Sequence, residues 1–349
     1  MSRQKTLPMK ELISLSRQLA LVIDSDLALY EGLSLIAEQT KDKASKQFTL
    51  RTRERISKGS SLSEAFAKES DVLPDFFVNM VSVGEQSGNL IKVLNRTADT
   101  YEKDAKVSAR VMSAVTYPII LSVLMICVII LLLVEVLPMF GDVLASLGGT
   151  MPGITRVLMS IGGFIGAYFY IFLAAAAVIA LAVIVLRQTE NGKAKLDAMK
   201  LKSPIRRNII KNIDCVRFAR NLAMLIRSGI GIAEGVAMSA TTMSNEKLKS
   251  MARDAAKKIE EGETLKSALT SLGLFSGLLL RILAVAENTG HTDDMLDKAA
   301  DNIEEELDAR LTKLTTVLEP ALIIVLSVIV GVVLISVILP VTSIMNTIG

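Results

Sequence analysis

Two short motifs hold the polar residues of this sequence that are best suited to binding. Residues 84–90 read G-E-Q-S-G-N-L, and residues 286–292 read A-E-N-T-G-H-T. In each motif a glutamate, Glu85 or Glu287, stands three positions before a glycine. A carboxylate at this place can contact a protein partner or hold a cation, and the motif alone is compatible with both. The two glutamates are therefore candidate partner-contact residues.

The glycines of the same motifs favour a structural interpretation. Gly88 and Gly290 suit a turn between two helices, because glycine adopts positive φ without steric cost. The polar residue after each glycine would then cap the next helix. Gly84 opens the first motif, and Ala286 stands at the equivalent position of the second. We expect a helix–turn–helix corner at both places.

Glu135 is a third candidate, because of where it stands. It is the only charged residue in the apolar stretch 111–141. Ionisable residues inside membrane segments often have a function. Glu135 is close to one end of its stretch, where a carboxylate can also reach water. A contact with a membrane-embedded partner and a simple solvent-facing position both stay open.

Catalytic and cofactor-binding motifs are absent from the sequence. It contains no G-x-x-x-x-G-K-[ST] phosphate loop and no H-E-x-x-H zinc motif. His291 is the only histidine, and Cys127 and Cys215 are the only cysteines. The formal net charge of +3 does not favour a nucleic-acid partner. We expect a protein that is not an enzyme, with no catalytic residue, no cofactor and no metal site.

The charge distribution indicates how these residues are positioned. Of the 349 residues, 51% are hydrophobic and 21% are charged, which fits soluble helical domains joined to a few membrane spans. Three stretches nearly free of charge predict transmembrane helices at 119–140, 159–186 and 319–340. The prediction is a multi-pass protein of the cytoplasmic (inner) membrane.

The positive-inside rule orients these spans. Basic residues such as Lys103 and Arg110 precede the first span, and residues 187–211 hold eight Lys and Arg against two acidic residues. The loop 141–158 carries only one acidic and one basic residue. We therefore expect a cytoplasmic N-terminus, both large domains in the cytoplasm and an external C-terminus.

An internal repeat organises the whole chain. Arg17, Gly32 and Gly59 match residues 203 positions later, and Glu85 and Gly88 match residues 202 positions later. A long register held with a single gap is typical of a duplication. Amphipathic spacing and the capping-box pattern at 61–64 predict helices throughout. The predicted fold is an all-α membrane protein with two repeated cytoplasmic six-helix bundles and three transmembrane helices.

The predicted domains follow in chain order. They are a first cytoplasmic bundle at 1–118, a transmembrane helix at 119–140, a short external loop at 141–158, a transmembrane helix at 159–186, a basic cytoplasmic linker at 187–211, a second cytoplasmic bundle at 212–318, a transmembrane helix at 319–340 and an external C-terminus at 341–349.

Small residues and prolines add details to the spans. Gly162, Gly163 and Gly166 have the spacing that permits close helix contact. Prolines stand at both ends of the first and third spans, where we expect them to mark helix entry and exit. These prolines are Pro118, Pro138, Pro320 and Pro340.

Several of these motifs together resemble one known family. They are G-E-Q-S-G-N-L at 84–90, R-V-M-S-A-V-T-Y-P at 110–118, V-L-P-M-F at 136–140 and M-P-G-I-T-R at 151–156. With the duplicated domain and three spans, the chain resembles the inner-membrane platform proteins of type II secretion systems (general secretion pathway protein F) and type IV pilus machines.

The resemblance implies a scaffold that performs no catalysis. Its cytoplasmic bundles would couple to a hexameric assembly ATPase, and its membrane part would hand pilin or pseudopilin subunits to a growing fibre. It would act as a homo-oligomer with other inner-membrane components of the machine. The absence of a phosphate loop agrees with energy supplied by a partner.

Two other classes of protein are alternatives. A small membrane transporter built on parallel repeats would need broken helices or polar groups near the middle of the bilayer. A membrane-bound enzyme would need a phosphate loop or catalytic acids. The three nearly continuous apolar stretches favour the platform interpretation over both.

Overall fold

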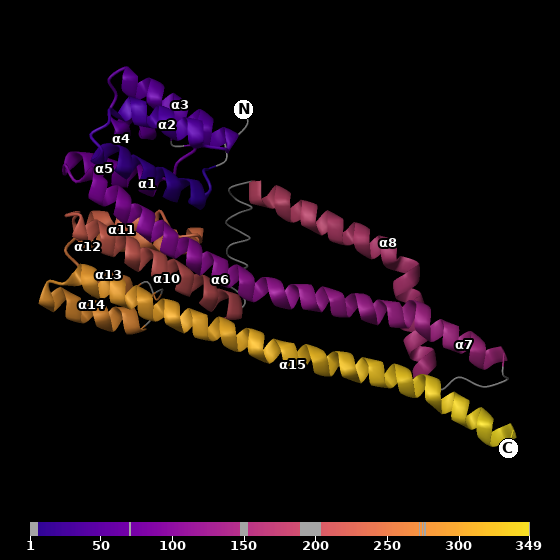
Figure 1. Ribbon diagram of the computed structural model, residues 1–349. Helices are drawn as coiled ribbons and strands as arrows, with labels where there is room; N and C mark the ends of the chain where they lie inside the picture. The colour runs from indigo at the N-terminus through magenta and orange to yellow at the C-terminus, as the bar shows by residue number, and fades with distance from the viewer. Residues whose placement is uncertain are drawn as a thin grey trace. The chain divides into compact units, whose positions relative to one another are not determined.

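The structure, a computed structural model, describes residues 6–69, 71–146, 153–188, 204–271, 273, 275 and 277–348. Within these ranges every regular element is a helix, and no strand occurs (Figure 1). The predicted all-α class is confirmed. The predicted loop 141–158 and linker 187–211 lie partly outside the described residues.

The first half of the chain begins with five helices and a sixth that is much longer. These are α1 (Met9–Asp24), α2 (Leu29–Gln39), α3 (Lys43–Ser57), α4 (Leu62–Ala67), α5 (Asp75–Gln86) and α6 (Leu90–Leu131). The start of α4 follows from its sequence, because Ser61 and Glu64 form the predicted capping box with reciprocal side-chain to backbone bonds.

The second half has a matching order of helices among the described residues. These are α10 (Pro204–Arg227), α11 (Ile232–Ala240), α12 (Glu246–Glu260), α13 (Leu265–Ser271), α14 (Gly277–Thr289) and α15 (Thr292–Ile348). The first residues of α11, α12, α13 and α15 are the repeat equivalents of the first residues of α2, α3, α4 and α6. The offset that relates the two halves of the sequence therefore also relates their helices.

Equivalent side chains also cap equivalent helices. The carboxylate of Asp42 accepts a bond from the Ser45 amide at the start of α3, at 2.8 Å. The side chain of Asn245, the repeat equivalent of Asp42, accepts bonds from the Lys247 and Leu248 amides at the start of α12. Each cap satisfies amides that a helix terminus leaves unpaired.

The chain forms two compact units. The first unit comprises Met1–Ala109 and Asp197–Asp308, and the second comprises Arg110–Leu196 and Ala309–Gly349. In the first unit, α1 to α5 surround a core that includes Phe48, Phe66 and Phe77. A second core, with Phe218 and Leu222, lies among α10 to α15.

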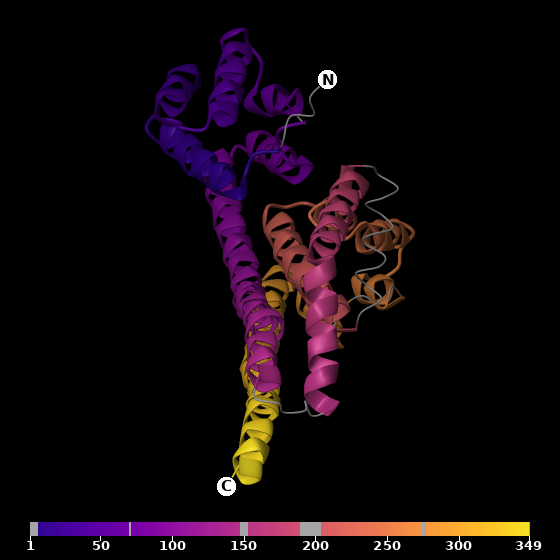
Figure 2. The same ribbon diagram turned by 90° about the vertical axis from the view of Figure 1, so that its right-hand side faces the viewer.

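The second unit contains long apolar helices. α6 continues past Arg110 to Leu131, and is followed by a short π-helix η1 (Leu132–Val136), α7 (Leu137–Ser146) and α8 (Gly153–Gln188). α6 and α15 each run as one continuous helix (Figure 1), and α6 can also be followed in Figure 2. Two helical stretches, Leu90–Val143 and Thr292–Ile335, are long and apolar enough to cross a membrane. The predicted middle span falls in α8 and stays a prediction.

The expectation that these prolines mark helix entry and exit is wrong. Pro118 lies inside α6, Pro138 inside α7, and both Pro320 and Pro340 inside α15. A proline removes one backbone hydrogen bond and crowds the carbonyl four residues before it. For Pro138 that carbonyl belongs to η1, whose wider turn relieves the crowding, so the helix continues.

The predicted close contact at the glycines of α8 is confirmed for Gly162. This residue is buried, and a Cβ atom built on it would overlap the backbone carbonyl of Leu133 in η1. Gly166 lies near Val134, at 3.4 Å from the added Cβ, whereas Gly163 has open space around it. Only a glycine at 162 therefore lets α8 approach η1 so closely.

Candidate functional site

The two glycine turns have the predicted backbone. Gly88 has a φ of +67° and Gly290 a φ of +72°, in the left-handed region that glycine adopts most readily. Gly84 is buried, and a Cβ atom there would lie 3.0 Å from the Cα atom of Leu90. Ala286, at the equivalent place, is fully buried. The first motif thus brings α5 unusually close to α6.

Glu85 has a specific structural contact. Its carboxylate accepts hydrogen bonds from the backbone amides of Leu62, at 2.8 Å, and Ser63, at 3.0 Å. These amides open α4, where the helix terminus favours a negative charge. Glu85 therefore ties α5 to the start of α4. The sequence offered no sign of this contact, because its partners stand in another helix, well before the motif.

Removing the Glu85 carboxylate should destabilise the protein. In Glu85→Ala, two amides at the start of α4 lose their acceptor, which costs about 1–2 kcal/mol. The measurement is thermal unfolding of the detergent-solubilised protein by circular dichroism. Gln86→Ala is the control, since the exposed Gln86 side chain donates to Ser82 within its own helix. Equal melting of the two variants would contradict the structural role of Glu85.

The structure shows less about the other two candidate residues, Glu287 and Glu135. Glu287 lies in α14, but its side chain is outside the described residues. Glu135 lies in η1 of the second unit with an exposed side chain. The roles of both as partner contacts stay predictions.

The repeat places two arginines in equivalent ion pairs. Arg17 on α1 pairs with Asp99 and Glu102 on α6. Arg220, its equivalent on α10, pairs with Asp301, at 3.0 Å, and with Glu304 on α15. The Arg17 side chain is 43% exposed, whereas that of Arg220 is 4% exposed. The sequence match showed the aligned positions but not that they form pairs.

A buried polar cluster lies within the first unit, where α6 meets α10. Arg217 on α10 approaches Asp104 on α6, with Nε 3.6 Å from Oδ2, and its Nη2 donates to Ser108. Asp104 is 4% exposed, and its second oxygen has no hydrogen-bond partner among the described residues. The buried hydroxyl of Tyr101 also has none in this part of the chain. Nothing in the sequence pattern had indicated this cluster.

Burial dominates the electrostatics of this cluster. It raises the pKa of Asp104 to about 6, although Arg217 and Arg220 act in the opposite direction and Glu304 adds to the rise. Burial, followed by the charge of Asp104, also raises the pKa of Tyr101. Residues of the cluster line a pocket of about 560 Å³ between the two halves of the first unit.

The stability of the protein should therefore depend on pH through Asp104. Its pKa is about 6 in the folded protein and 3.8 ordinarily, so between these values the folded state binds more protons than the unfolded state. The free energy of unfolding therefore falls as pH rises through this window, and Asp104 accounts for about 3 kcal/mol of that fall.

Asp104→Asn should remove this part of the pH dependence. Melting temperatures of the detergent-solubilised wild type and variant, measured from pH 4 to pH 8, should diverge in favour of the variant as pH rises. Asp71→Asn, at an exposed position, serves as the control. Parallel curves for wild type and Asp104→Asn would show that Asp104 titrates normally.

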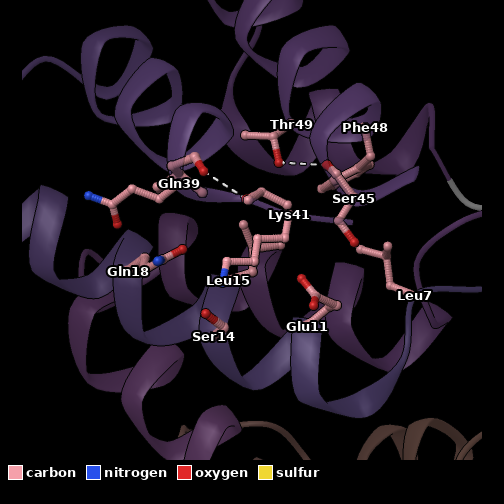
Figure 3. Close-up of a pocket in the computed structure, with 12 residues that line it drawn as sticks. Leu7, Glu11, Ser14, Leu15, Gln18, Gln39, Lys41, Ser45, Phe48 and Thr49 are labelled. Carbon is pink, nitrogen blue, oxygen red and sulfur yellow. Dashed lines mark hydrogen bonds between the residues drawn. The ribbon is translucent and has the colours of Figure 1, made fainter. Parts of the chain in front are cut away.

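A smaller pocket of about 220 Å³ lies on the first half of the first unit (Figure 3). Ser14 and Gln18 on α1, Gln39 at the end of α2, and Lys41 line it, together with the apolar side chain of Leu15. Among the described residues, no group of three or more His, Cys, Asp or Glu side chains is arranged to hold a metal ion.

Before any comparison, these observations indicate an all-helical protein built from two repeated halves, with helices that could cross a membrane. The chain is all-helical where described, carries two helices able to cross a membrane, and repeats its helix order and ion pairs in two halves. Glu85, Arg17 and Arg220 join helices. Gly88 and Gly290 form turns.

Comparison with known proteins identifies the family. The model of the family described as "Type II secretion system (T2SS), protein F" matches the chain twice, at residues 15–138 and 218–340. The chain belongs to this family, whose members are inner-membrane components. The two matches coincide with the two halves of the repeat.

Similar proteins cover nearly the whole chain. A type IV pilus assembly protein PilC from Thermus thermophilus is 32% identical over 98% of this chain and 84% of its own length. A type II secretion system protein F from Aeromonas hydrophila is 28% identical over 97% of this chain and 87% of its own length. A PilC from Pseudomonas aeruginosa is 26% identical over 99% and 92%.

Proposed function

We propose that this protein is the inner-membrane platform of a type II secretion or type IV pilus assembly machine. In this role it couples a cytoplasmic hexameric ATPase to the insertion of pilin or pseudopilin subunits into a fibre. The observation that carries the proposal is the double family match, together with relatives of both kinds that align over nearly the full chain.

In the proposed role the protein is a scaffold and not an enzyme. Its sequence holds no phosphate loop, so the energy comes from the partner ATPase. The residues singled out by sequence and structure, Glu85 and Gly88 among them, join and turn helices. A transporter would need broken helices or polar groups near the middle of the bilayer. The transporter alternative is weaker, because Glu135 is the only charged residue of the apolar stretch 111–141 and is close to one end of it.

The proposed architecture has two repeated six-helix bundles and three spans. Both bundles lie in the cytoplasm, the N-terminus is cytoplasmic and the C-terminus external, with boundaries as the sequence predicts. The charge asymmetry around the spans supports this topology. A reporter active only in the cytoplasm should be active when fused after Lys211 and silent when fused after Gly149. The reverse pattern would overturn the topology.

The proposed partners are the ATPase, pilin or pseudopilin subunits, other inner-membrane components and further copies of this chain. Deleting the protein should abolish fibre or pseudopilus assembly, while pilin synthesis and membrane insertion continue. The purified protein should hydrolyse no ATP. Cross-linkers on the cytoplasmic bundles should capture the ATPase in cells with an assembled machine. Fibres that still form without the protein would refute the platform role.

A further inference from the structure

The pocket of about 560 Å³ between the two halves of the first unit has the size of a small-molecule site. Such sites usually enclose about 300–1,000 Å³ and combine apolar walls with a few polar groups. Here the first half of the chain supplies apolar side chains, and the second half supplies polar ones. The apolar side chains include Met9, Leu12, Leu73 and Phe76, and the polar ones are Arg217, Thr241, Thr242 and Lys249.

Two buried polar groups on the wall of this pocket have no partner. Among the described residues, Oδ1 of Asp104 and the hydroxyl of Tyr101 form no hydrogen bond, and neither atom is accessible to solvent. Most buried polar groups in folded proteins are paired, because an unpaired one costs free energy. The terminal torsion of an aspartate is soft, so a small rotation turns Oδ1 toward the pocket. A ligand in the pocket is therefore placed to bond with both groups.

Packing does not explain the hydroxyl of Tyr101. The ring of Tyr101 packs against Phe76 and Phe77, with centroid distances of 6.5 and 6.3 Å. The repeat equivalent of Tyr101 is Ile303, which is fully buried in the core of the second half. An apolar side chain is thus sufficient at this place in the fold. The buried hydroxyl therefore favours a role in binding.

The two unpartnered groups fit a ligand that donates hydrogen bonds. A carboxylate oxygen only accepts, and a phenol oxygen can accept as well as donate. A primary ammonium group has three N–H donors and no acceptor, so one such group can donate to both Asp104 and Tyr101. Its bond to the carboxylate is charge-assisted and about twice as strong as a bond between neutral groups.

The charges around Asp104 also favour a cation. Arg217 does not neutralise this carboxylate fully, because its Nε lies 3.6 Å from Oδ2 and its two terminal nitrogens donate to Ser108 and Ser244. Burial accordingly keeps the pKa of Asp104 at about 6. The other charged groups near the carboxylate or on the pocket wall are Arg220 on α10, Glu304 on α15, Asp75 on α5 and Lys249 on α12.

We propose that this pocket binds a small primary amine with an apolar body. The ammonium group donates hydrogen bonds to Asp104 and Tyr101, and the body packs against the apolar side chains of the first half. Because the ligand touches both halves, it strengthens the junction between them. The inference goes beyond the proposed function and does not depend on it, since its test measures binding to the purified protein.

Calorimetric titration of the detergent-solubilised full chain tests the proposal. The probes are phenethylamine and hexylamine, and the matched neutral compounds are phenethyl alcohol and hexanol. At pH 8 at least one amine should bind saturably, and at least about tenfold more tightly than its alcohol, because only the amine forms the charge-assisted bond.

Two variants locate the binding site. Asp104→Asn should weaken amine binding at least about tenfold, because it removes the negative charge. Tyr101→Phe should weaken it about threefold, because it removes one acceptor and keeps the ring that packs in the core. Asp71→Asn, at an exposed position that does not line the pocket, is the control and should bind like the wild type.

The pH dependence gives an independent readout. With a pKa of about 6, only about a tenth of Asp104 is ionised at pH 5, so amine binding to the wild type should be about tenfold weaker at pH 5 than at pH 8. A primary amine stays protonated over this range, as lysine does. The affinity of Asp104→Asn should not change between these two pH values.

A thermal measurement guards against a small calorimetric signal. At pH 8 the bound amine should raise the melting temperature of the wild type above that measured with its alcohol, and should not do so for Asp104→Asn. Three results would each overturn the proposal. They are no saturable binding of either amine, as expected for a pocket that holds only water, equal affinity for amine and alcohol, and undiminished binding to Asp104→Asn.

Discussion

Arg220→Met should destabilise the protein by about 3 kcal/mol, whereas Arg17→Met should cost less than about 1 kcal/mol. The two arginines occupy equivalent positions and pair with equivalent acidic residues. They differ in burial: Arg220 is 4% exposed and its partner Glu304 is 16% exposed, while Arg17 is 43% exposed. Removing Arg220 takes away the buried cation that pairs with Glu304, whereas water screens the carboxylates beside Arg17.

The comparison is made by thermal unfolding of both variants in the same detergent. Adding Glu304→Gln to Arg220→Met removes a largely buried negative charge and should restore part of the lost stability. Adding Glu102→Gln to Arg17→Met should change little. Equal losses in the two single variants would show that burial does not distinguish the two ion pairs.

Gly162→Val should weaken the packing of the second unit by about 3 kcal/mol, at the upper end of overpacking substitutions. The added Cβ atom would overlap the backbone carbonyl of Leu133 in η1. A backbone atom cannot rotate away as a side chain can, so α8 must separate from η1. The contact matters because Leu133 also belongs to a small buried cluster with Leu137 and Val333.

Gly163→Val is the matched control for this prediction. A Cβ atom at 163 meets no other atom within 4 Å, so this variant should melt at the wild-type temperature or slightly above it. The two variants differ by one position in the same helix and have the same composition. Similar melting temperatures would show that α8 and η1 do not pack through Gly162.

Much of the local structure follows directly from sequence. The capping box of Ser61 and Glu64, and the turn glycines Gly88 and Gly290, act over a few residues, so short patterns predict them. The repeat offset located the equivalent helices, because duplicated segments keep the spacing of their turns. The proline prediction was wrong for Pro138, because the wider turn of the neighbouring π-helix relieves the crowding at the carbonyl four residues before this proline.

By itself, the sequence determined the helical class, the turns and the aligned positions of the two halves. Only the tertiary structure decided which aligned residues are buried. The repeat aligns Arg17 with Arg220, and Leu21 with Met224. In each pair the first residue is exposed and the second is buried. The physical reason is that burial depends on what packs against a helix. The first half of the chain covers the part of α10 that holds Met224, whereas Leu21, at the equivalent place on α1, is exposed.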